Sequence, residues 1–288
     1  MPELPEVETV RRTLEKLVVG RKIGLVTVGL PRIVQRMEPE AFSRNLAGQT
    51  IRGIGRRGKF LRIVLDDLVI VSHLRMEGRY GLFAADEPVE KHTHVVFRFE
   101  DGMELRYKDV RQFGTMELFP IGRELELPPL AKLGVEPLSA DFTVAALKRL
   151  LSGRTTAIKP LLLNQVYVVG IGNIYVDESL HRARIHPLRT ADSLSGAEWT
   201  RLHEAIVHVL SEAVEMGGST VKSYVNGQGE MGMFQQQLAV YSRKDMPCPA
   251  CGTLIVKTVV GGRGTHFCPS CQPGGRGSSR KAGKVNRK

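Results

Sequence analysis

The pattern of hydrophobic and polar residues changes its period along the chain. In "EVETVRRTLEKLVVG", apolar residues recur at steps of three and four from Val7 to Val18. This spacing predicts an amphipathic helix that starts after Pro5 and ends at Gly20.

From Gly24 to about Phe119 the chain consists of short β-branched runs. The runs "FLRIVLDDLVIVSHL" and "HVVFRFEDGMELRY" predict two hairpins, which turn at Asp66-Asp67 and at Asp101-Gly102. We therefore expect an all-β domain, a sandwich, with one amphipathic helix at its front.

The proline-rich stretch "FPIGRELELPPLAKLGVEPL" predicts a hinge, and the sequence after it is helical. Four segments have helical patterns: "DFTVAALKRLLSG", "IKPLLLNQ", "NIYVDESLHRA" and "GAEWTRLHEAIVHVLSEAVEMGG". We expect Trp199, in the last of them, to pack in a core. With 288 residues the chain is long enough for two or three domains.

Composition narrows the class of protein. Apolar residues make up 42% of the chain, which is enough to build cores, yet no apolar run approaches the ~20 residues of a membrane span. The first residues are acidic, with no basic stretch leading into an apolar one, so the sequence predicts no signal peptide. We expect a cytosolic protein.

The net charge of +11 indicates a polyanionic partner. The last segment, "QPGGRGSSRKAGKVNRK" at 272–288, contains six cations and no acid, so residues 1–271 still carry a net +5. The alternative is that the charge serves only solubility.

The motifs "CPAC" and "CPSC" are separated by 16 residues and supply four thiols: Cys248, Cys251, Cys268 and Cys271. Two such knuckles fit one structural Zn²⁺ ion in a closed tetrahedral site. Two disulfides are disfavoured in a reducing cytosol, and a redox dithiol would not need a second copy.

Two glycine-rich turns are candidates for binding phosphate. "TVVGGRGTHF" predicts a hairpin with Arg263 at its tip. In "VVGIGNIYVDESL", Gly170 and Gly172 predict a tight turn, and Asn173 an N-cap for a helix that starts at Ile174. A plain helix–helix turn would give the same second pattern.

Long or flat side chains near the predicted hairpin ends could act as wedges in a base stack. They are Met76 in "SHLRMEGRY" and Arg111 and Phe113 in "DVRQFG". Taken singly, each is more typical of a core or rim position. Lys59 lies in the cationic strand "RRGKFL", where a lysine is ordinarily a surface charge.

The first residues, "MPELPE", place a proline and a carboxylate at the start of the mature chain if Met1 is trimmed. An α-amino group has a pKa of about 7.7–8.0, so part of it is neutral and nucleophilic near pH 7. The secondary amine of Pro2 could attack the sugar carbon C1′ of a nucleoside, with Glu3 moving protons at the sugar oxygen. Alternatively, Pro2 and Pro5 only start a helix.

Taken together, these motifs closely resemble those of the bacterial formamidopyrimidine-DNA glycosylases, repair enzymes for oxidised purines. The resemblance runs from Met1 to Cys271 and includes "PELPEVETVRR", "RRGKFL", "SHLRMEGRY", "DVRQFG", "GIGNIYVDESL", "GGST", "FQ…VY" and the cysteine knuckles.

The resemblance implies an α+β multidomain fold. We expect an N-terminal β-sandwich at 1–135, a helix–two-turn–helix domain with a lesion-recognition loop at 136–236, a zinc hairpin at 237–271, and a disordered basic tail at 272–288. It also implies one Zn²⁺ ion, a monomer, and damaged double-stranded DNA as the partner, lying across the cleft between the domains.

The resemblance also implies residue roles. Pro2 would be the Schiff-base nucleophile and Glu3 a proton donor, while Lys59 would assist β-elimination and Arg263 δ-elimination. The residues expected to contact DNA are His73, Met76, His92, Arg111, Phe113, Arg154, Asn173 and Tyr241. Those expected to contact the lesion are Glu77, Ser219, Thr220 and Tyr224.

The predicted function is a DNA glycosylase and abasic-site lyase of base-excision repair. Two alternatives are the related endonuclease of oxidised pyrimidines, which typically has glycine at the position of Leu4, and a non-catalytic zinc-containing DNA-binding module. Two features depart from the family: the basic tail, which we expect to add salt-dependent DNA affinity, and Ser242, where glycine is usual.

Overall fold

The computed structural model describes residues 1–219 and 232–274. The chain divides into two compact units, one made of Met1–Leu133 and Ala213–Gln236 and the other of Gly134–Glu212 and the chain from Gln237 onward. The predicted hinge contains the boundary at Leu133. Residues 213–236, which the sequence boundaries placed with the helical domain, are in the first unit.

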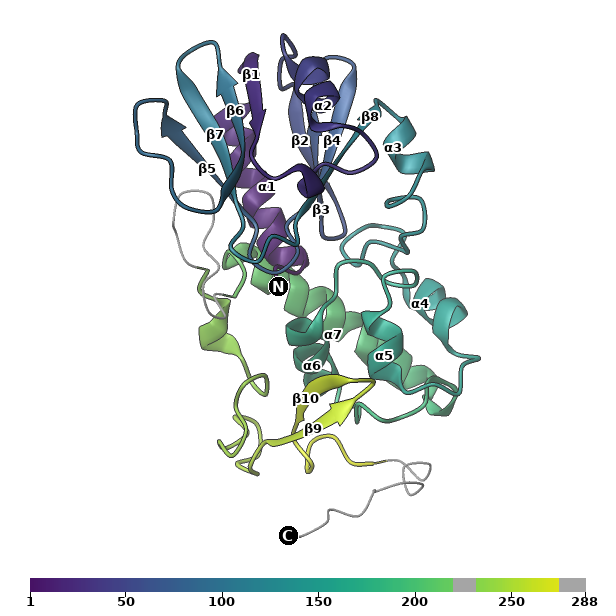
Figure 1. The fold of residues 1–288 in the computed structure, drawn as a ribbon. Helices are drawn as coiled ribbons and strands as arrows, with labels where there is room; N and C mark the ends of the chain where they lie inside the picture. Colours follow the sequence, from purple (N-terminus) through teal and green to yellow (C-terminus); the bar gives the residue numbers. More distant parts are fainter. Residues whose placement is uncertain (220–231, 275–288) are drawn as a thin grey trace. The chain divides into compact units, whose positions relative to one another are not determined.

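The first unit is built on two antiparallel four-stranded sheets, with strand orders β1-β6-β7-β5 and β2-β3-β4-β8 (Figure 1). Its elements are α1 (Leu4–Val18), β1 (Ile23–Val28), α2 (Pro39–Leu46), β2 (Gly53–Arg57), β3 (Phe60–Val64), β4 (Leu68–His73), β5 (Arg79–Ala84), β6 (Thr93–Phe99), β7 (Met103–Lys108), β8 (Thr115–Pro120) and α3 (Arg123–Glu126), with a 3₁₀ turn at Pro31–Ile33. The two predicted hairpins are confirmed as β3–β4 and β6–β7.

One apolar core joins both sheets and the first two helices. Leu14 of α1, Phe42 and Leu46 of α2, and Leu61 of β3 are all fully buried in it. Helix α2 was not predicted from the sequence, although Pro39 at its first position is a common helix start.

Helix α1 begins at Leu4, slightly before the predicted start after Pro5. Glu3 is its N-cap residue and forms a capping box with Glu6, three residues later. The capping box fixes the first turn of α1, so Glu3, directly after Pro2, has a defined position.

The second unit is helical and carries a small hairpin at its end (Figure 1). Its elements are α4 (Val144–Leu151), α5 (Ile158–Leu163), α6 (Asn173–Arg182), α7 (Gly196–Glu215, which continues into the first unit), β9 (Val256–Val260) and β10 (Arg263–Phe267), with a 3₁₀ turn at Ala191–Ser193. A further 3₁₀ turn, Phe234–Gln237, crosses the boundary between the units. The four predicted helices are confirmed, and Trp199 is fully buried. No helix among the described residues is long and apolar enough to cross a membrane.

The prediction that Asn173 caps a helix starting at Ile174 is wrong. Gly172 is the N-cap residue and Asn173 is the first residue of α6. The Asn173 side chain instead donates through Nδ2 to the carbonyl oxygen of Gly264 in β10, at 2.9 Å. This long-range contact replaces the local cap that the sequence indicated.

Candidate functional site

The N-terminal turn is buried except for Met1. Met1 is 48% exposed, whereas Pro2 and Glu3 are buried. The Glu3 backbone N–H donates to Oε2 of Glu6, at 2.8 Å. The predicted nucleophile and its neighbouring carboxylate therefore stand on a fixed helix start.

Glu6 also holds the segment in which the lesion-recognition loop was predicted. Its Oε1 accepts the backbone N–H of Ser219 at 2.8 Å, and both side chains are buried. Gly218 has a φ of +81°, and a Cβ at that position would lie 2.7 Å from Glu6 Oε1, so the approach requires glycine. Ser219 is thus brought to the N-terminal turn, while Thr220 and Tyr224 lie outside the described residues.

Lys59 is buried in the turn between β2 and β3, and an arginine ties this turn to α1. Arg56 donates through Nε to Glu8 at 3.0 Å and through Nη1 to the carbonyl of Gly58 at 2.9 Å. Burial alone would raise the pKa of Glu8. The hydrogen bonds that Glu8 accepts from Arg11 and Arg56 have the larger combined effect, so the pKa of Glu8 lies below its usual value.

His73, at the end of β4, lies next to this turn. It pairs with Phe60 in the sheet, and its Nδ1 accepts the backbone N–H of Arg75 at 2.8 Å. Burial lowers the pKa of His73 to about 3, with further contributions from the charges of Arg75 and Lys59. His73 is therefore neutral at physiological pH, and any contact that it makes with DNA is made without charge.

The loop that presents Arg111 and Phe113 is organised by a fully buried carboxylate, Asp109. Its Oδ1 accepts the N–H of Arg111 at 3.1 Å, and its Oδ2 accepts those of Phe113 and Gly114 at 2.9 and 2.8 Å. The backbone is fixed while the Phe113 side chain stays 53% exposed, with the Arg111 guanidinium 5.1 Å from its ring centroid. An exposed aromatic ring on a rigid loop suits insertion into a base stack.

The loop that carries Met76 lies beside the loop that carries Arg111 and Phe113, because a glycine of each loop packs against the hydroxyl group of Tyr107. Tyr107 is fully buried, and a Cβ at Gly78 or Gly114 would come within 2.2 and 1.7 Å of its hydroxyl oxygen. Only glycine fits at either position. Met76 and Glu77, directly before Gly78, are half-buried. The three predicted wedge residues are thus brought together.

His92 contacts the start of the loop that follows Asp109. It is half-buried with a φ of +68°, and its carbonyl accepts the N–H of Asp109 at 3.0 Å. The His92 backbone therefore supports residues 109–114, which we call the wedge loop.

In the second unit, a buried ion pair fixes the hairpin. Lys159 of α5 and Asp177 of α6 are fully buried and joined at 2.7 Å. Lys159 also donates to Thr265 Oγ1 at 2.7 Å, and Asp177 Oδ2 accepts the N–H of His266 at 2.8 Å. Two helices therefore hold strand β10 through charge-assisted hydrogen bonds.

Helix α6 holds a second segment through Glu178. Its carboxylate accepts three consecutive backbone N–H groups, those of Ala239, Val240 and Tyr241. Burial raises the pKa of Glu178, although these hydrogen bonds oppose the rise. The Tyr241 ring packs edge-on against His266, at 5.2 Å between centroids.

Arg263 begins β10 directly after the turn at Gly261 and Gly262, both of which have positive φ. Its side chain is exposed, whereas the carbonyl of the next residue, Gly264, accepts from both Lys159 and Asn173. Arg263 therefore projects from an anchored backbone. Arg154 is also exposed, with its guanidinium 4.3 Å from the centroid of the Tyr167 ring.

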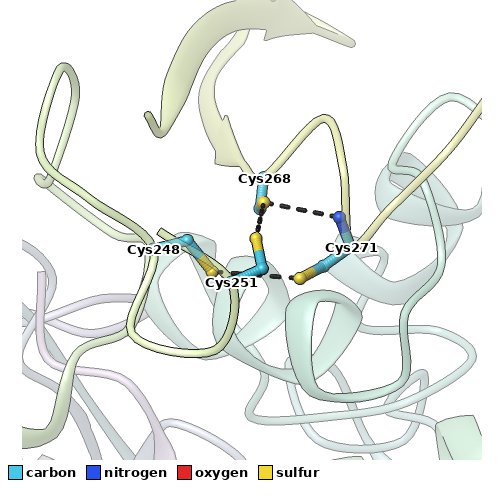
Figure 2. Close-up of side chains that lie close together, drawn as sticks. All are labelled: Cys248, Cys251, Cys268 and Cys271. Atoms are coloured by element: carbon cyan, nitrogen blue, oxygen red, sulfur yellow. Dashed lines mark hydrogen bonds between the residues drawn. The ribbon is translucent and has the colours of Figure 1, made fainter. Parts of the chain in front are cut away.

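The four cysteines converge as predicted. Their sulfur atoms point toward one another and lie within 4.8 Å of one another (Figure 2), with Cys248–Cys271 at 3.9 Å and Cys251–Cys268 at 3.5 Å. Zinc–sulfur bonds of about 2.3 Å in a tetrahedron place sulfurs about 3.8 Å apart, so the four residues fit one Zn²⁺ ion. All four positions of such a site are filled by protein, which makes it structural.

The site residues divide between the two units. The first contains Pro2, Glu3, Lys59, His73, Met76, Glu77, His92, Arg111, Phe113 and Ser219, and the second contains Arg154, Asn173, Tyr241, Arg263 and the four cysteines. Sequence reasoning missed the residues that hold them: Glu6, Asp109, Lys159, Asp177 and Glu178. Two had a local signal, since Glu6 stands three residues after an N-cap and Asp109 stands just before a turn.

Family models match most of the chain. The "Formamidopyrimidine-DNA glycosylase N-terminal domain" matches residues 1–116, the "Formamidopyrimidine-DNA glycosylase H2TH domain" matches 133–225, and the "Zinc finger found in FPG and IleRS" matches 247–274. Relatives named formamidopyrimidine-DNA glycosylase include one from Brevibacillus brevis, 64% identical over 94% of this chain and 99% of the relative, and one from Bacillus subtilis, 58% identical over the same shares.

Solved structures are similar over nearly the whole chain. The complex of Lactococcus lactis Fpg with DNA containing an abasic site has a TM-score of 0.90 and 44% identity, and covers 94% of this chain and all of that one. The L. lactis Fpg complex with DNA containing N7-benzyl-Fapy-dG has a TM-score of 0.89 and 44% identity, covering 95% of this chain and all of that one.

Proposed function

The chain belongs to the formamidopyrimidine-DNA glycosylase family, and from this premise we propose that it is a bifunctional enzyme of base-excision repair. It removes oxidised purines, 8-oxoguanine and formamidopyrimidines, from double-stranded DNA and then nicks the strand at the abasic site. The L. lactis relatives, described in complex with DNA containing Fapy-dG and an abasic site, support both steps.

The first step uses the imino nitrogen of Pro2, which becomes available once Met1 is removed. Its lone pair forms a bond to C1′ of the damaged nucleotide, and the N-glycosidic bond breaks with its electron pair leaving on the base. The hydrogen of the Pro2 nitrogen passes as a proton to the departing base. Glu3 donates a proton to the sugar ring oxygen, the ring opens, and a cationic iminium results. The burial of both residues and the capping box with Glu6 support this assignment, since they fix the reacting groups in place.

The iminium acidifies the C2′ hydrogen and so prepares strand cleavage. Loss of that proton expels the 3′ phosphate in β-elimination, which Lys59 assists by proton transfer; Arg263 assists the δ-elimination that releases the 5′ phosphate. The buried position of Lys59, in a turn tied to α1 through Arg56, supports its role. The exposed guanidinium of Arg263 on an anchored strand suits a phosphate contact.

Base flipping leaves a gap that the wedge residues fill. Met76, Arg111 and Phe113 occupy this gap. Their stacking on the neighbouring bases partly offsets the cost of unstacking the damaged base, which is on the order of a few kcal/mol. The rigid support of both loops by Tyr107 and Asp109 favours this role.

The remaining residues hold the substrate. His73, His92, Arg154, Asn173 and Tyr241 contact the DNA backbone or flanking bases, and Glu77, Ser219, Thr220 and Tyr224 contact the extruded base. Zinc, when bound by the four cysteines, stabilises the fold of the hairpin unit.

We place the enzyme in the cytoplasm, acting as a monomer on chromosomal DNA. The basic tail at 272–288 adds phosphate contacts that carry no sequence information. Gln272, at its start, is packed inside the second unit, so these contacts come from the residues after it.

Borohydride trapping tests the proposal. Wild-type protein is incubated with duplexes that contain 8-oxoguanine or thymine glycol, and the iminium is reduced to a stable adduct. We expect an adduct and a nick on the first duplex, and neither with protein whose N-terminal nitrogen is blocked, while the blocked protein still binds the duplex.

The alternative functions give other results. Cleavage of the thymine glycol duplex alone indicates the pyrimidine endonuclease. Binding by the wild type with neither adduct nor nick indicates a non-catalytic DNA-binding module.

A further inference from the structure

A histidine outside the cysteine cluster contacts one of its sulfur atoms. His181 lies in the last turn of α6, and its Nε2 is 3.3 Å from Sγ of Cys248. Both side chains are buried, at 8% and 2% exposure. The pair therefore interacts away from water, where a hydrogen bond is stronger than at the surface.

The chemistry of a zinc thiolate determines the direction of this hydrogen bond. A cysteine that binds Zn²⁺ has lost its proton, so its sulfur can only accept. The hydrogen must then be on Nε2 of His181. An N–H that points at a thiolate draws charge from the sulfur, which makes the thiolate less reactive toward electrophiles.

We propose that His181 is a positioning residue of the zinc site, which donates its Nε2 hydrogen to the Cys248 thiolate, slows zinc release and fastens the first knuckle to α6. Outer contacts of this kind orient metal ligands and tune the metal's affinity. The inference concerns the metal site, and it holds or fails independently of the reaction proposed above.

The second knuckle is fastened to the same end of α6. Gln272 is buried; its Nε2 donates to the carbonyl of Ile185 at 2.9 Å, and its Oε1 accepts the N–H of Cys268 at 2.9 Å. Residues 181–185 thus hold a ligand-bearing loop from each half of the site. Loss of the His181 contact leaves this second attachment in place, so the variants can keep their fold while the metal is held less tightly.

Two near-isosteric substitutions separate hydrogen bonding from packing. His181→Met keeps an unbranched side chain of suitable length but offers no donor. His181→Gln has almost the same shape and presents an N–H group. Packing alone predicts equal behaviour of the two variants, whereas a hydrogen bond to sulfur predicts that only glutamine restores the wild-type behaviour.

The experiment uses the full-length protein, loaded with one equivalent of zinc as measured by metal analysis. A chromophoric chelator in excess reports the rate of zinc release, and mass spectrometry reports the rate at which iodoacetamide alkylates Cys248. We expect His181→Met to release zinc about tenfold or more faster than wild type. We expect His181→Gln to stay closer to wild type than to the methionine variant, with Cys248 alkylation following the same order. His208→Met, at a half-exposed histidine of α7, is the control and should match wild type.

Other results overturn the proposal. Equal release rates for wild type and both variants mean that the contact does not act on the metal, and equally fast release from both variants means that His181 only fills space. If His181→Met does not fold, His181→Phe replaces it as the variant without a donor, because its ring occupies the volume of the imidazole.

Discussion

Buried carboxylates hold functional segments in both units, but the apolar clusters around those segments differ in size. In the first, buried carboxylates organise the loops by accepting backbone N–H groups: Glu6 for Ser219 and Asp109 for the wedge loop. This unit has one large apolar core shared by its two sheets. In the second, the hairpin region has a small apolar cluster of Val240, Cys248, Ile255 and Cys268, which the partly buried Cys271 joins.

One helix adds polar contacts to this small cluster at the hairpin region. Along α6, Asn173, Asp177, Glu178 and His181 each reach the hairpin unit with a polar side chain. A small unit cannot bury enough apolar surface to be stable, so metal and buried polar contacts supply the difference. We therefore expect the hairpin region of the second unit to be the more sensitive to loss of a single polar group.

Removal of one partner of the buried ion pair should have the largest effect. Lys159→Met leaves the Asp177 carboxylate buried without its cation, which we expect to destabilise the second unit by about 3–5 kcal/mol. Trp199 is the only tryptophan in the chain and is buried in this unit, so its fluorescence during urea unfolding reports the loss. The double variant Lys159→Met/Asp177→Asn should recover part of the stability. A loss below about 1 kcal/mol in the single variant would contradict the proposed difference between the units.

The first unit can be tested at the Asp109 loop. Asp109→Ala leaves three backbone N–H groups, two part-buried and one buried, without their acceptor, and we expect a cost of about 3 kcal/mol. Hydrogen exchange should show the loss in the wedge loop, with Trp199 fluorescence unchanged. Asp86→Ala, at an exposed turn, is the control. Unchanged protection of Arg111 and Phe113 would show that the loop is held by something else.

His73 should make the stability of the first unit dependent on pH. Its folded-state pKa of about 3 lies below its ordinary value of 6.5. Between these values the unfolded chain takes up a proton that the folded chain does not, so stability falls as the pH drops below 6.5. The loss from this group is about 2 kcal/mol at pH 5. His73→Asn should show a correspondingly smaller fall in urea midpoint between pH 7 and pH 5; parallel curves for the two proteins would disprove the assignment.

The smallest expected effect is a gain. Ser242 has a φ of +60°, in the left-handed region that favours glycine. Ser242→Gly should stabilise the second unit by about 1 kcal/mol, because relief of the strained conformation exceeds the entropy cost of glycine. Urea unfolding followed by Trp199 fluorescence measures the change, and a loss of stability would mean that the serine contributes a contact that outweighs the strain.

The local elements could be predicted from the sequence because their signals are local. Alternation around Asp66-Asp67 and Asp101-Gly102 predicted both hairpins, and the spacing of the cysteine knuckles predicted the metal cluster. The short helix α2 was missed because its eight residues lie among strand-like runs.

The supports of the site were missed because they join distant parts of the chain. Glu6 and Ser219 are 213 residues apart, and Lys159 and Thr265 are 106 apart. The spacing of apolar residues along the chain gives no signal for contacts between residues so far apart. Asn173 shows the same limit: a residue type suited to a local cap is used for a contact with Gly264 that only the tertiary fold creates.

The central claim is that the imino nitrogen of Pro2 forms the covalent bond to the damaged nucleotide. Peptide mass spectrometry of the borohydride-trapped complex with an 8-oxoguanine duplex tests it most directly. The account predicts an adduct on an N-terminal peptide that begins at Pro2 and lacks Met1. An adduct on Lys59, or an active protein that retains Met1, would contradict it.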